Sequence, residues 1–310
     1  MFGKKLAFNG IKHRVVRNVN GYYKLSPLPT AGELDDFYKK NYYELIKKGG
    51  RAPELMRQMK RGKESLRERK WLQSTLYQDI ISVIRESFNG SRVRLLDIGC
   101  GSGEMIRYMS RNGFEAFGIE PYEKKKDFRS TRGIEIFTGT LAEAVMGRKA
   151  WKRSFDVVTL MSVLEHVPNP DEVISQAAGF LKPGRGLICI RVPNDFNPLQ
   201  FFAHKALKKR PWWVAVPDHL NYFSVDALSR YLSKLGFDPV YVTTDFPMEL
   251  FLLLGDDYVG RPDIGKECHR KRIMFESALD PEFRRKLYRT FAELGIGRDV
   301  MIFAKLRKPR

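Results

Sequence analysis

The stretch Leu95-Leu96-Asp97-Ile98-Gly99-Cys100-Gly101-Ser102-Gly103 decides the fold of this chain. An apolar run over residues 93–98 predicts a buried strand, three glycines follow it at alternating positions, and a helical pattern begins near Glu104. Because glycine has no Cβ and reaches positive φ cheaply, backbone in such a turn can approach a ligand closely. The helix behind the turn offers free N–H groups at its N-terminus. The stretch therefore predicts a strand, a glycine turn and a helix arranged around a bound ligand.

Strands and helices alternate over the rest of the chain. Further strands are predicted at residues 114–119, 134–137, 155–160, 186–192, 240–243 and 300–304. This alternation is typical of an α/β fold, here a Rossmann-like sheet of seven mostly parallel strands with helices on both faces. We expect one domain over 91–310, with insertions at 195–218 and 246–297. Residues 1–90 are expected to form a mostly helical N-terminal extension, which begins with short strands or an extended arm and serves as a lid or a dimer contact.

The chain is strongly basic. It has 310 residues, with 55 Lys and Arg against 36 Asp and Glu, and a formal net charge of +19. This excess favours anionic partners such as nucleic acid, phosphorylated substrates or a membrane surface, and the alternative is a solvated basic surface without a specific partner. Three scattered cysteines form neither a disulfide framework nor a metal-binding pattern. No signal-peptide pattern is present and the longest apolar run, near 250–254, is too short to span a bilayer, so we expect a cytoplasmic protein.

Two acidic residues indicate which ligand the glycine turn binds. Glu120 lies at the end of the next predicted strand, where a carboxylate can accept hydrogen bonds from both hydroxyls of a ribose. The Gly99-x-Gly101-x-Gly103 spacing argues against NAD, because a dinucleotide turn needs G-x-G-x-x-G. Asp97 would face the pyrophosphate of NAD, whereas an ammonium or sulfonium group would be attracted to it. The alternative for Asp97 is a capping role at the turn.

Several motifs in order resemble one family. The runs 95–103, 155–168, 181–192 and 218–237, together with Glu120, are similar to those of class I S-adenosylmethionine-dependent methyltransferases. The resemblance covers about residues 91–243 and the last strand, and it implies that the last strand is antiparallel. The segment 217–224 resembles a subgroup found near sugar, polysaccharide and secondary-metabolite pathways. Some members of that subgroup carry a cysteine-rich zinc ribbon near the N-terminus, but no cysteine precedes Cys100 here.

The resemblance implies S-adenosyl-L-methionine as the cofactor. Asp97 and the backbone of the glycine turn would hold its methionine part, and Glu120 its ribose hydroxyls. The loop at Thr140 and Leu141 would flank the adenine, and Met161 would meet the methionine part through its backbone. The complete set of expected cofactor-binding residues is Asp97, Gly99, Cys100, Gly101, Ser102, Gly103, Glu120, Pro121, Thr140, Leu141, Met161 and Glu165.

Two histidines are the candidate catalytic residues. Methyl transfer from an activated sulfonium depends largely on positioning, but a hydroxyl acceptor also has to lose its proton. His219 and His166 are the candidate bases, although His166 alternatively shapes the pocket and His219 alternatively makes a loop hydrogen bond. Glu165 and His166 are also similar to the metal-dependent O-methyltransferases of ubiquinone biosynthesis. Those enzymes have another Glu three residues earlier, where this chain has Ser162, so we expect no metal.

The insertion at 195–218 follows a strand of the predicted sheet and therefore lies over the ligand crevice. Its four basic residues suit a phosphate or diphosphate on the acceptor, and its two tryptophans suit stacking on a sugar or contact with a membrane surface. The alternative is a lid packed by the tryptophans, with the charges in water. These residues are Lys205, Lys208, Lys209, Arg210, Trp212 and Trp213.

The sequence thus predicts a methyltransferase that acts on a hydroxyl of a small molecule or glycan, including a phosphorylated, nucleotide-linked or lipid-linked sugar. One alternative is an RNA methyltransferase, which the net charge and the basic run at 51–70 favour. The chain has no recognisable RNA-binding module, which weighs against that alternative. The other alternative is a cofactor-binding partner protein that catalyses no reaction.

Overall fold

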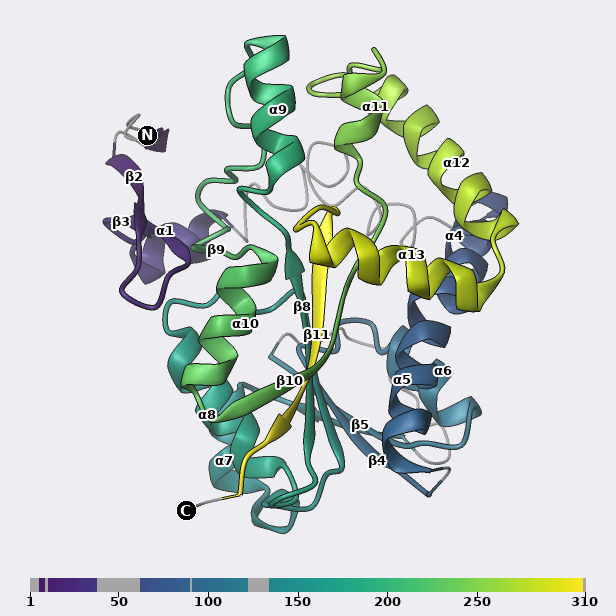
Figure 1. The fold of residues 1–310 in the computed structure, drawn as a ribbon. Coiled ribbons are helices and arrows are strands. Elements are labelled where there is room, and N and C mark those ends of the chain that lie inside the picture. The colour runs from purple at the N-terminus through teal and green to yellow at the C-terminus, as the bar shows by residue number, and fades with distance from the viewer. Residues whose placement is uncertain (1–5, 9–10, 38–61, 90, 122–133, 309–310) are drawn as a thin grey trace.

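A seven-stranded sheet forms the centre of the molecule, with helices on both sides (Figure 1). The computed structural model describes residues 6–8, 11–37, 62–89, 91–121 and 134–308. The strand order is β10-β11-β8-β7-β4-β5-β6. In chain order these strands are β4 (Arg94–Ile98), β5 (Glu115–Glu120), β6 (Ile134–Thr138), β7 (Val157–Met161), β8 (Leu187–Pro193), β10 (Phe237–Thr244) and β11 (Asp299–Leu306).

Strand direction places the site at one edge of this sheet. The five strands from β4 to β8 pair in parallel, whereas β11 pairs antiparallel with both β8 and β10. The chain runs outward from β4 to β6 and then returns to β7 on the other side of β4. Ligands bind at such a reversal, beyond the carboxyl ends of the strands. The predicted α/β fold, including its antiparallel strand near the C-terminus, is confirmed.

Helices cover both faces of the sheet because each has one apolar side. One core contains the strands together with α7 (Leu141–Gly147), α8 (Pro170–Phe180) and α10 (Val225–Lys234). The opposite core contains α5 (Gln78–Phe88) and α6 (Glu104–Arg111), which lie on the other side of the sheet in Figure 1. Since α5 shares this core with β4, the boundary expected at residue 91 does not separate two cores.

The N-terminal residues form a second, smaller sheet rather than a helical arm. Its strands are β1 (Leu6–Phe8), β2 (Ile11–Arg17) and β3 (Tyr23–Ser26), and β3 pairs with β9 (Asn221–Tyr222). Of the two alternatives for the start of the chain, the structure therefore has the short strands. The short helix α1 (Ala31–Asp36) follows, with the capping box between Thr30 and Glu33. Most of the basic run at 51–70 lies outside the described residues.

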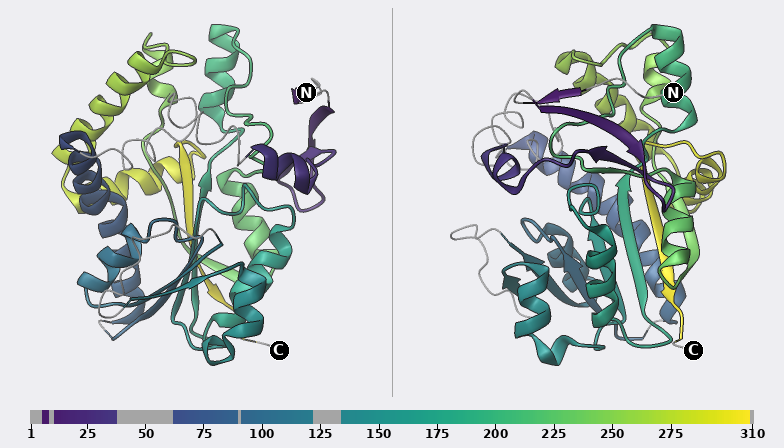
Figure 2. Two further views of the ribbon diagram at one scale, coloured as in Figure 1. Left: turned by 180° about the vertical axis from the view of Figure 1, so that it is seen from behind. Right: turned by 90° about the vertical axis from the view of Figure 1, so that its left-hand side faces the viewer.

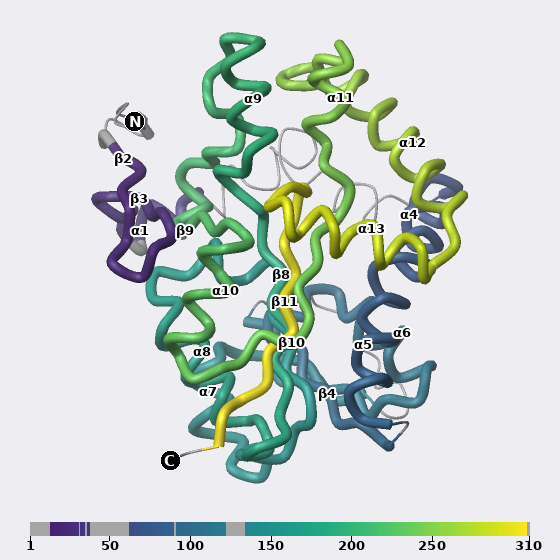
Figure 3. The backbone as a smooth tube through the Cα atoms, in the orientation of Figure 1, coloured from purple at the N-terminus to yellow at the C-terminus, as the bar shows by residue number. Residues whose placement is uncertain are grey.

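Helical segments extend beyond the carboxyl ends of the strands. The insertion after β8 contains α9 (Pro198–Leu207), which packs against α11 (Glu249–Leu253). Figure 2 shows that these helices and the N-terminal strands lie toward the same end of the sheet. Figure 3 follows the chain from β10 through α11, α12 (Pro262–Ala278) and α13 (Pro281–Glu293) to β11. Among the described residues, no helix combines the length and the apolar composition needed to cross a bilayer.

The N-terminal helices pack against this C-terminal insertion. Helix α4 (Lys63–Leu72) continues through the π-helical turn η2 (Gln73–Tyr77) into α5, and η2 contacts α12. The remaining element, a 3-10 turn at η3 (Lys149–Trp151), leads into β7. The helices α4 and α5 of the expected extension therefore pack against both the sheet and the 246–297 insertion.

Candidate active site

The glycine turn after β4 has the backbone geometry of a ligand cradle. Gly99 and Gly101 have φ of +75° and +54°, a region that side chains with a Cβ rarely adopt. A Cβ on Gly99 would lie 2.9 Å from Cγ2 of Val163, so the turn packs closely against the loop after β7. A Cβ on Gly101 would meet no atom within 4 Å, so space lies open beside the turn. The turn leads directly into α6, whose N-cap Gly103 makes no side-chain hydrogen bond to the first turn of the helix.

Glu120 lies beside the turn, as the sequence predicts. The backbone N–H of Gly101 donates a hydrogen bond of 2.7 Å to Oε2 of Glu120 at the end of β5. The carboxylate is half-buried at the rim of the cradle. Its role in binding a ribose stays a prediction.

Asp97 is a buried carboxylate behind the same turn. Its side chain is 3% exposed, and the hydroxyl of Thr159 on the neighbouring strand β7 donates a hydrogen bond of 2.6 Å to Oδ1. Burial raises the pKa of Asp97 to about 7; the hydrogen bond from Thr159 lowers that pKa, and the negative charge of Glu120 raises it. The carboxylate is held against the sheet by Thr159. A positively charged group of a ligand would favour its ionised form.

The other expected cofactor residues occupy varied positions around the cradle. Cys100 is buried, Ser102 and Pro121 are exposed, and Met161 ends β7. The Thr140 hydroxyl is part of a capping box at the start of α7, so its first role is structural, and Leu141 packs partly buried beside it. Ligand contacts by these residues stay predictions.

The contacts of Glu165 are with the candidate bases and their neighbours, and not with the glycine turn. Its side chain is 2% exposed, and Oε1 is 3.9 Å from Nε2 of His166. Burial raises the pKa of Glu165 to about 7, and the neighbouring His166 lowers it. The carbonyl of Glu165 accepts hydrogen bonds from the N–H groups of Leu220 and Asn221, which fixes the loop after β7 against the segment before β9.

The tertiary structure brings the two candidate bases into contact. The rings of His166 and His219 meet edge to face with centroids 4.9 Å apart. Nδ1 of His166 lies 2.8 Å from the carbonyl oxygen of Asp218, and the Asp218 side chain is 2% exposed. Because β4 and β7 are adjacent and parallel, this histidine cluster and the glycine turn lie at the same edge of the sheet.

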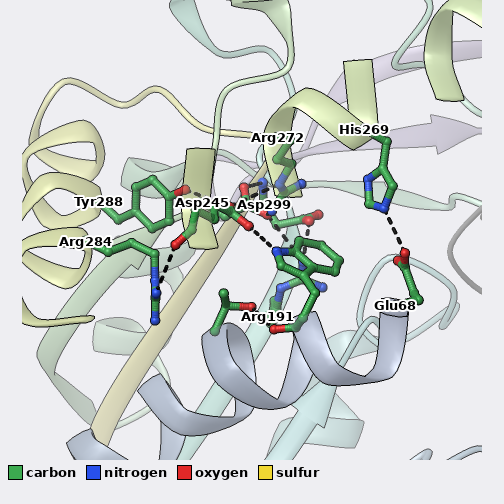
Figure 4. A network of polar contacts seen from close by, with 11 residues as sticks. Glu68, Arg191, Asp245, His269, Arg272, Arg284, Tyr288 and Asp299 are labelled. Carbon is green, nitrogen blue, oxygen red and sulfur yellow. Dashed lines mark hydrogen bonds and ion pairs between the residues drawn. The ribbon is translucent and has the colours of Figure 1, made fainter. Parts of the chain in front are cut away.

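A second polar cluster fills the space between β8, β10, β11 and the helices α4, α12 and α13 (Figure 4). On the sheet, Arg191 forms ion pairs with Asp245 and Asp299. Arg272 of α12 also pairs with Asp245, at 2.9 Å. The charges thereby balance in a buried place, and these partners hold the pKa of Asp245 below its usual value against the opposing effect of burial.

This cluster connects the N-terminal helices to the C-terminal insertion. Glu276 accepts hydrogen bonds from the indole of Trp71 and the hydroxyl of Tyr288, both 2.6 Å long, and also pairs with Arg272. His269 of α12 lies 2.9 Å from Oε2 of Glu68 on α4 (Figure 4). Sequence reasoning missed the whole cluster, because its members come from six distant segments and share no spacing.

The structure corrects the expectation for one of the two tryptophans of the 195–218 insertion. Trp213 is 6% exposed and packs with Phe196, Leu220 and Tyr222 beneath the small sheet. Its surface is therefore used in packing, as in the alternative of a packed lid, and cannot stack on a sugar or enter a membrane. Trp212 is half-buried against it, with ring centroids 4.9 Å apart.

The basic residues of this insertion divide into two groups. Lys209 is paired with Asp257 at 2.7 Å, which ties the end of α9 to the segment after α11. Lys205, Lys208 and Arg210 are exposed on the surface. Their predicted contact with an anionic acceptor stays a prediction.

The fold and the glycine turn define the class of protein: a Rossmann-like α/β protein with a ligand cradle at the carboxyl ends of its parallel strands. A family model described as "Methyltransferase domain" matches residues 66–242, more than half of the chain. The chain belongs to this family of methyltransferase domains. The more specific resemblance to sugar and secondary-metabolite enzymes stays a prediction.

Curated relatives and solved structures agree with this family. The chain is 30% identical over 155 residues to the ubiquinone biosynthesis O-methyltransferase of Azoarcus sp. (strain BH72), a match that covers 47% of this chain and 65% of that protein. The matches to three such relatives span between 46% and 65% of the relatives' lengths.

Two solved structures show the same fold at low sequence identity. One is a SAM-dependent methyltransferase from Archaeoglobus fulgidus, with a TM-score of 0.50, 19% identity, and coverage of 86% of this chain and 100% of that chain. The other is the Burkholderia thailandensis 1,6-didemethyltoxoflavin-N1-methyltransferase with bound 1,6-didemethyltoxoflavin and S-adenosylhomocysteine, with a TM-score of 0.51, 12% identity, and coverage of 98% and 100%.

The residues of the cradle fit the cofactor. S-adenosyl-L-methionine supplies a methyl group on a positively charged sulfur, which makes the methyl carbon open to attack. No atom would meet a Cβ on Gly101 within 4 Å, and the buried carboxylate of Asp97, when ionised, would be complementary to the positive groups of the cofactor. Glu120 lies at the rim, where Oε2 accepts the hydrogen bond from Gly101. These features come from two adjacent strands and their turns, so the cradle is preformed by the sheet.

Proposed function

We propose that this methyltransferase transfers the methyl group to a hydroxyl oxygen of a small molecule. The observation that carries this proposal is the contact between His166 and His219 at the edge of the sheet where the glycine turn lies. An oxygen acceptor loses its proton as it gains the methyl group, and imidazoles are suited to handling that proton. The names of the curated relatives, ubiquinone biosynthesis O-methyltransferases, favour a small acceptor over a glycan.

Each part of the site has a separate task in this proposal. Asp97 and the turn at 99–103 bind the methionine part, and Glu120 binds the ribose. The cluster of His166 and His219 receives the hydroxyl group and promotes the loss of its proton. The carbonyl of Glu165, which accepts two backbone hydrogen bonds from Leu220 and Asn221, keeps the two histidine segments in register. Catalysis then depends on holding the acceptor oxygen in line with the bond that breaks.

The experiment that tests this function offers labelled S-adenosyl-L-methionine and a panel of small hydroxyl compounds to the purified chain. The panel includes catechols, phenols and sugar phosphates. A mass gain of one methylene unit on a hydroxyl compound supports the proposal. Transfer to amines alone, or to none of the hydroxyl classes while the cofactor binds normally, contradicts it. Asp97→Ala is expected to abolish transfer and cofactor binding, whereas Asp226→Asn, a change at an exposed carboxylate on α10, leaves both intact.

The RNA alternative is tested with the same protein. Exposed Lys205, Lys208 and Arg210 add to the basic surface that motivates it. A specific RNA substrate requires retention of RNA that weakens as the salt concentration rises, together with methyl incorporation into the retained RNA. Salt-dependent retention without incorporation indicates a basic surface only.

A further inference from the structure

Three side chains with metal-binding atoms converge beside the proposed acceptor position. One ligand atom each from His166, Asp218 and His219 lies within 4.8 Å of the other two. His166 follows β7 of the large sheet, whereas Asp218 and His219 precede β9 of the small sheet, so the group joins segments of the two sheets. Two imidazoles and a carboxylate are a ligand set that transition metals prefer.

The hydrogen bond of His166 fixes which ring nitrogen would bind a metal. Nδ1 lies 2.8 Å from the carbonyl oxygen of Asp218. A carbonyl only accepts, so Nδ1 carries the proton and the lone pair of the neutral ring is on Nε2. Histidines that bind metals are commonly oriented in this way, with the second nitrogen donating to a backbone carbonyl or a carboxylate. Oε1 of Glu165 is 3.9 Å from this Nε2, which places a further carboxyl group beside the three side chains.

Main-chain and amide hydrogen bonds hold the two segments that carry the ligands. The N–H of Leu220 donates to the carbonyl of Glu165 at 2.6 Å. The side-chain amide of Asn221 donates to the carbonyls of Leu164 and Val167, at 2.9 and 2.7 Å. On one segment the bonded residues lie on both sides of His166 in the sequence. On the other they come directly after His219. Such a rigid frame is what keeps metal ligands in place before the metal arrives.

We propose that His166, Asp218 and His219 bind a divalent transition-metal cation that activates the hydroxyl of the acceptor. The proposal deepens the proposed function and rests on it for its catalytic part. Tetrahedral ligands at zinc-like distances are about 3.4 Å apart, so no separation in the group has to shorten by more than about 1.4 Å on binding. Three protein ligands leave a coordination position for the acceptor oxygen. The nitrogen ligands select ions such as Zn²⁺, Co²⁺ or Ni²⁺ over Mg²⁺ and Ca²⁺.

The reaction step balances without a further reagent. The cation lowers the pKa of the acceptor hydroxyl, its O–H bond breaks, and the proton passes to water. An electron pair of the oxygen forms the new O–CH₃ bond while the C–S bond of the cofactor breaks. That bonding pair stays on sulfur, which leaves neutral S-adenosylhomocysteine. In this scheme the histidines act as ligands, and the proton of the acceptor is removed through the cation they hold.

The proposed ligand set differs from that of the metal-dependent enzymes that the Glu165-His166 pair resembles. The expectation of no metal depends on Ser162, which occupies the position of a missing Glu. The group proposed here does not use position 162. Its carboxylate comes from Asp218, which lies more than fifty residues further along the chain and reaches His166 through β9 and the small sheet.

Cation binding is measured directly on the full chain after treatment with a chelator. Co²⁺ is added to the protein, and the visible absorption of bound Co²⁺ is followed, with Zn²⁺ titrated by calorimetry in parallel. We expect one equivalent to bind. His219→Ala and Asp218→Asn should each weaken binding by at least about tenfold. His204→Gln, a histidine on α9 outside the group, should bind as the wild type does. Calorimetric binding of S-adenosylhomocysteine by each variant confirms that it is folded.

The outcomes separate this inference from the proposed function. Absence of stoichiometric Co²⁺ and Zn²⁺ binding by the wild-type protein overturns the inference, as does binding that the two ligand variants leave unchanged. Methyl transfer to a hydroxyl by the chelated protein at the full rate also overturns it, while the proposed function stands. If the wild type binds one equivalent of cation and the ligand variants do not, the metal site is supported. If methyl transfer then occurs only to amines, the hydroxyl acceptor is contradicted. The wild-type titration requires no variant, so the inference remains open to refutation if a substitution prevents folding.

Discussion

Thr159 on β7 donates a hydrogen bond of 2.6 Å to Asp97 on β4, and this pair joins two adjacent strands beneath the glycine turn. The carboxylate is buried, and burial raises its pKa to about 7. The hydrogen bond favours the ionised form and limits that rise. A cofactor with positive groups gains most from Asp97 when the carboxylate is ionised, so the pair links cofactor affinity to pH.

Affinity for S-adenosyl-L-methionine should fall as the pH is lowered through about 7, because Asp97 takes up a proton in that range. The sign follows from the raised pKa: the ionised form, which attracts the cofactor, is populated above about 7 and lost below it. In Asp97→Asn the affinity should be lower and this part of the pH dependence should be absent. Calorimetry between pH 5.5 and 8.5 measures both. If the affinity of the variant depends on pH as steeply as that of the wild type, Asp97 is not the group responsible.

Thr159→Val removes the hydroxyl that donates to Asp97 and keeps a similar shape. Without this hydrogen bond the ionised carboxylate is less stable by roughly 1.5–3 kcal/mol, so cofactor affinity near pH 7 should fall about tenfold or more. The pH at which half of the affinity is lost should move upward. Thr159→Ser retains a hydroxyl and should remain near the wild type. Equal losses in the two variants would mean that packing, rather than the hydrogen bond, is responsible.

Arg272→Ala should destabilise the protein by about 3–5 kcal/mol, because it removes one charged partner each from Asp245 and Glu276 within the polar cluster. The matched control is Arg270→Ala on the same helix. Arg270 pairs with Glu267 on the surface, where both side chains are about half exposed, and its loss should cost no more than about 1 kcal/mol. Chemical denaturation measures both changes. Similar values for the two variants would contradict the structural role of the buried cluster.

Trp213→Ala should cost about 3–5 kcal/mol of stability, since the ring is buried against Phe196 and Tyr222. The half-buried Trp212 is the control: Trp212→Ala should cost clearly less. Thermal unfolding compares the two variants. A Trp213 variant with unchanged stability and a raised KM for the acceptor would restore the stacking role that the sequence suggests for this residue.

The chemistry of the cofactor cradle can be predicted from the sequence because its parts are close in the chain or periodic. The glycines at 99, 101 and 103 lie within one turn, and Glu120 ends the next strand, so the parallel pairing of β4 and β5 is enough to bring them together. The same local rules predict the capping box at Thr30 and Glu33. The position of Thr159 opposite Asp97 depends instead on the register between β4 and β7, which no spacing reveals.

The sequence by itself determined the order of strands and helices, the glycine turn and the carboxylates around it, because backbone preferences and hydrophobic periodicity act over short distances. Tertiary packing decided the rest. It placed Trp213 in a core, gathered Arg191, Asp245 and Arg272 into a buried network, and brought His219 and Asp218 against His166. These contacts join segments far apart in the chain, so they follow from how the small sheet, the insertions and the large sheet exclude water together.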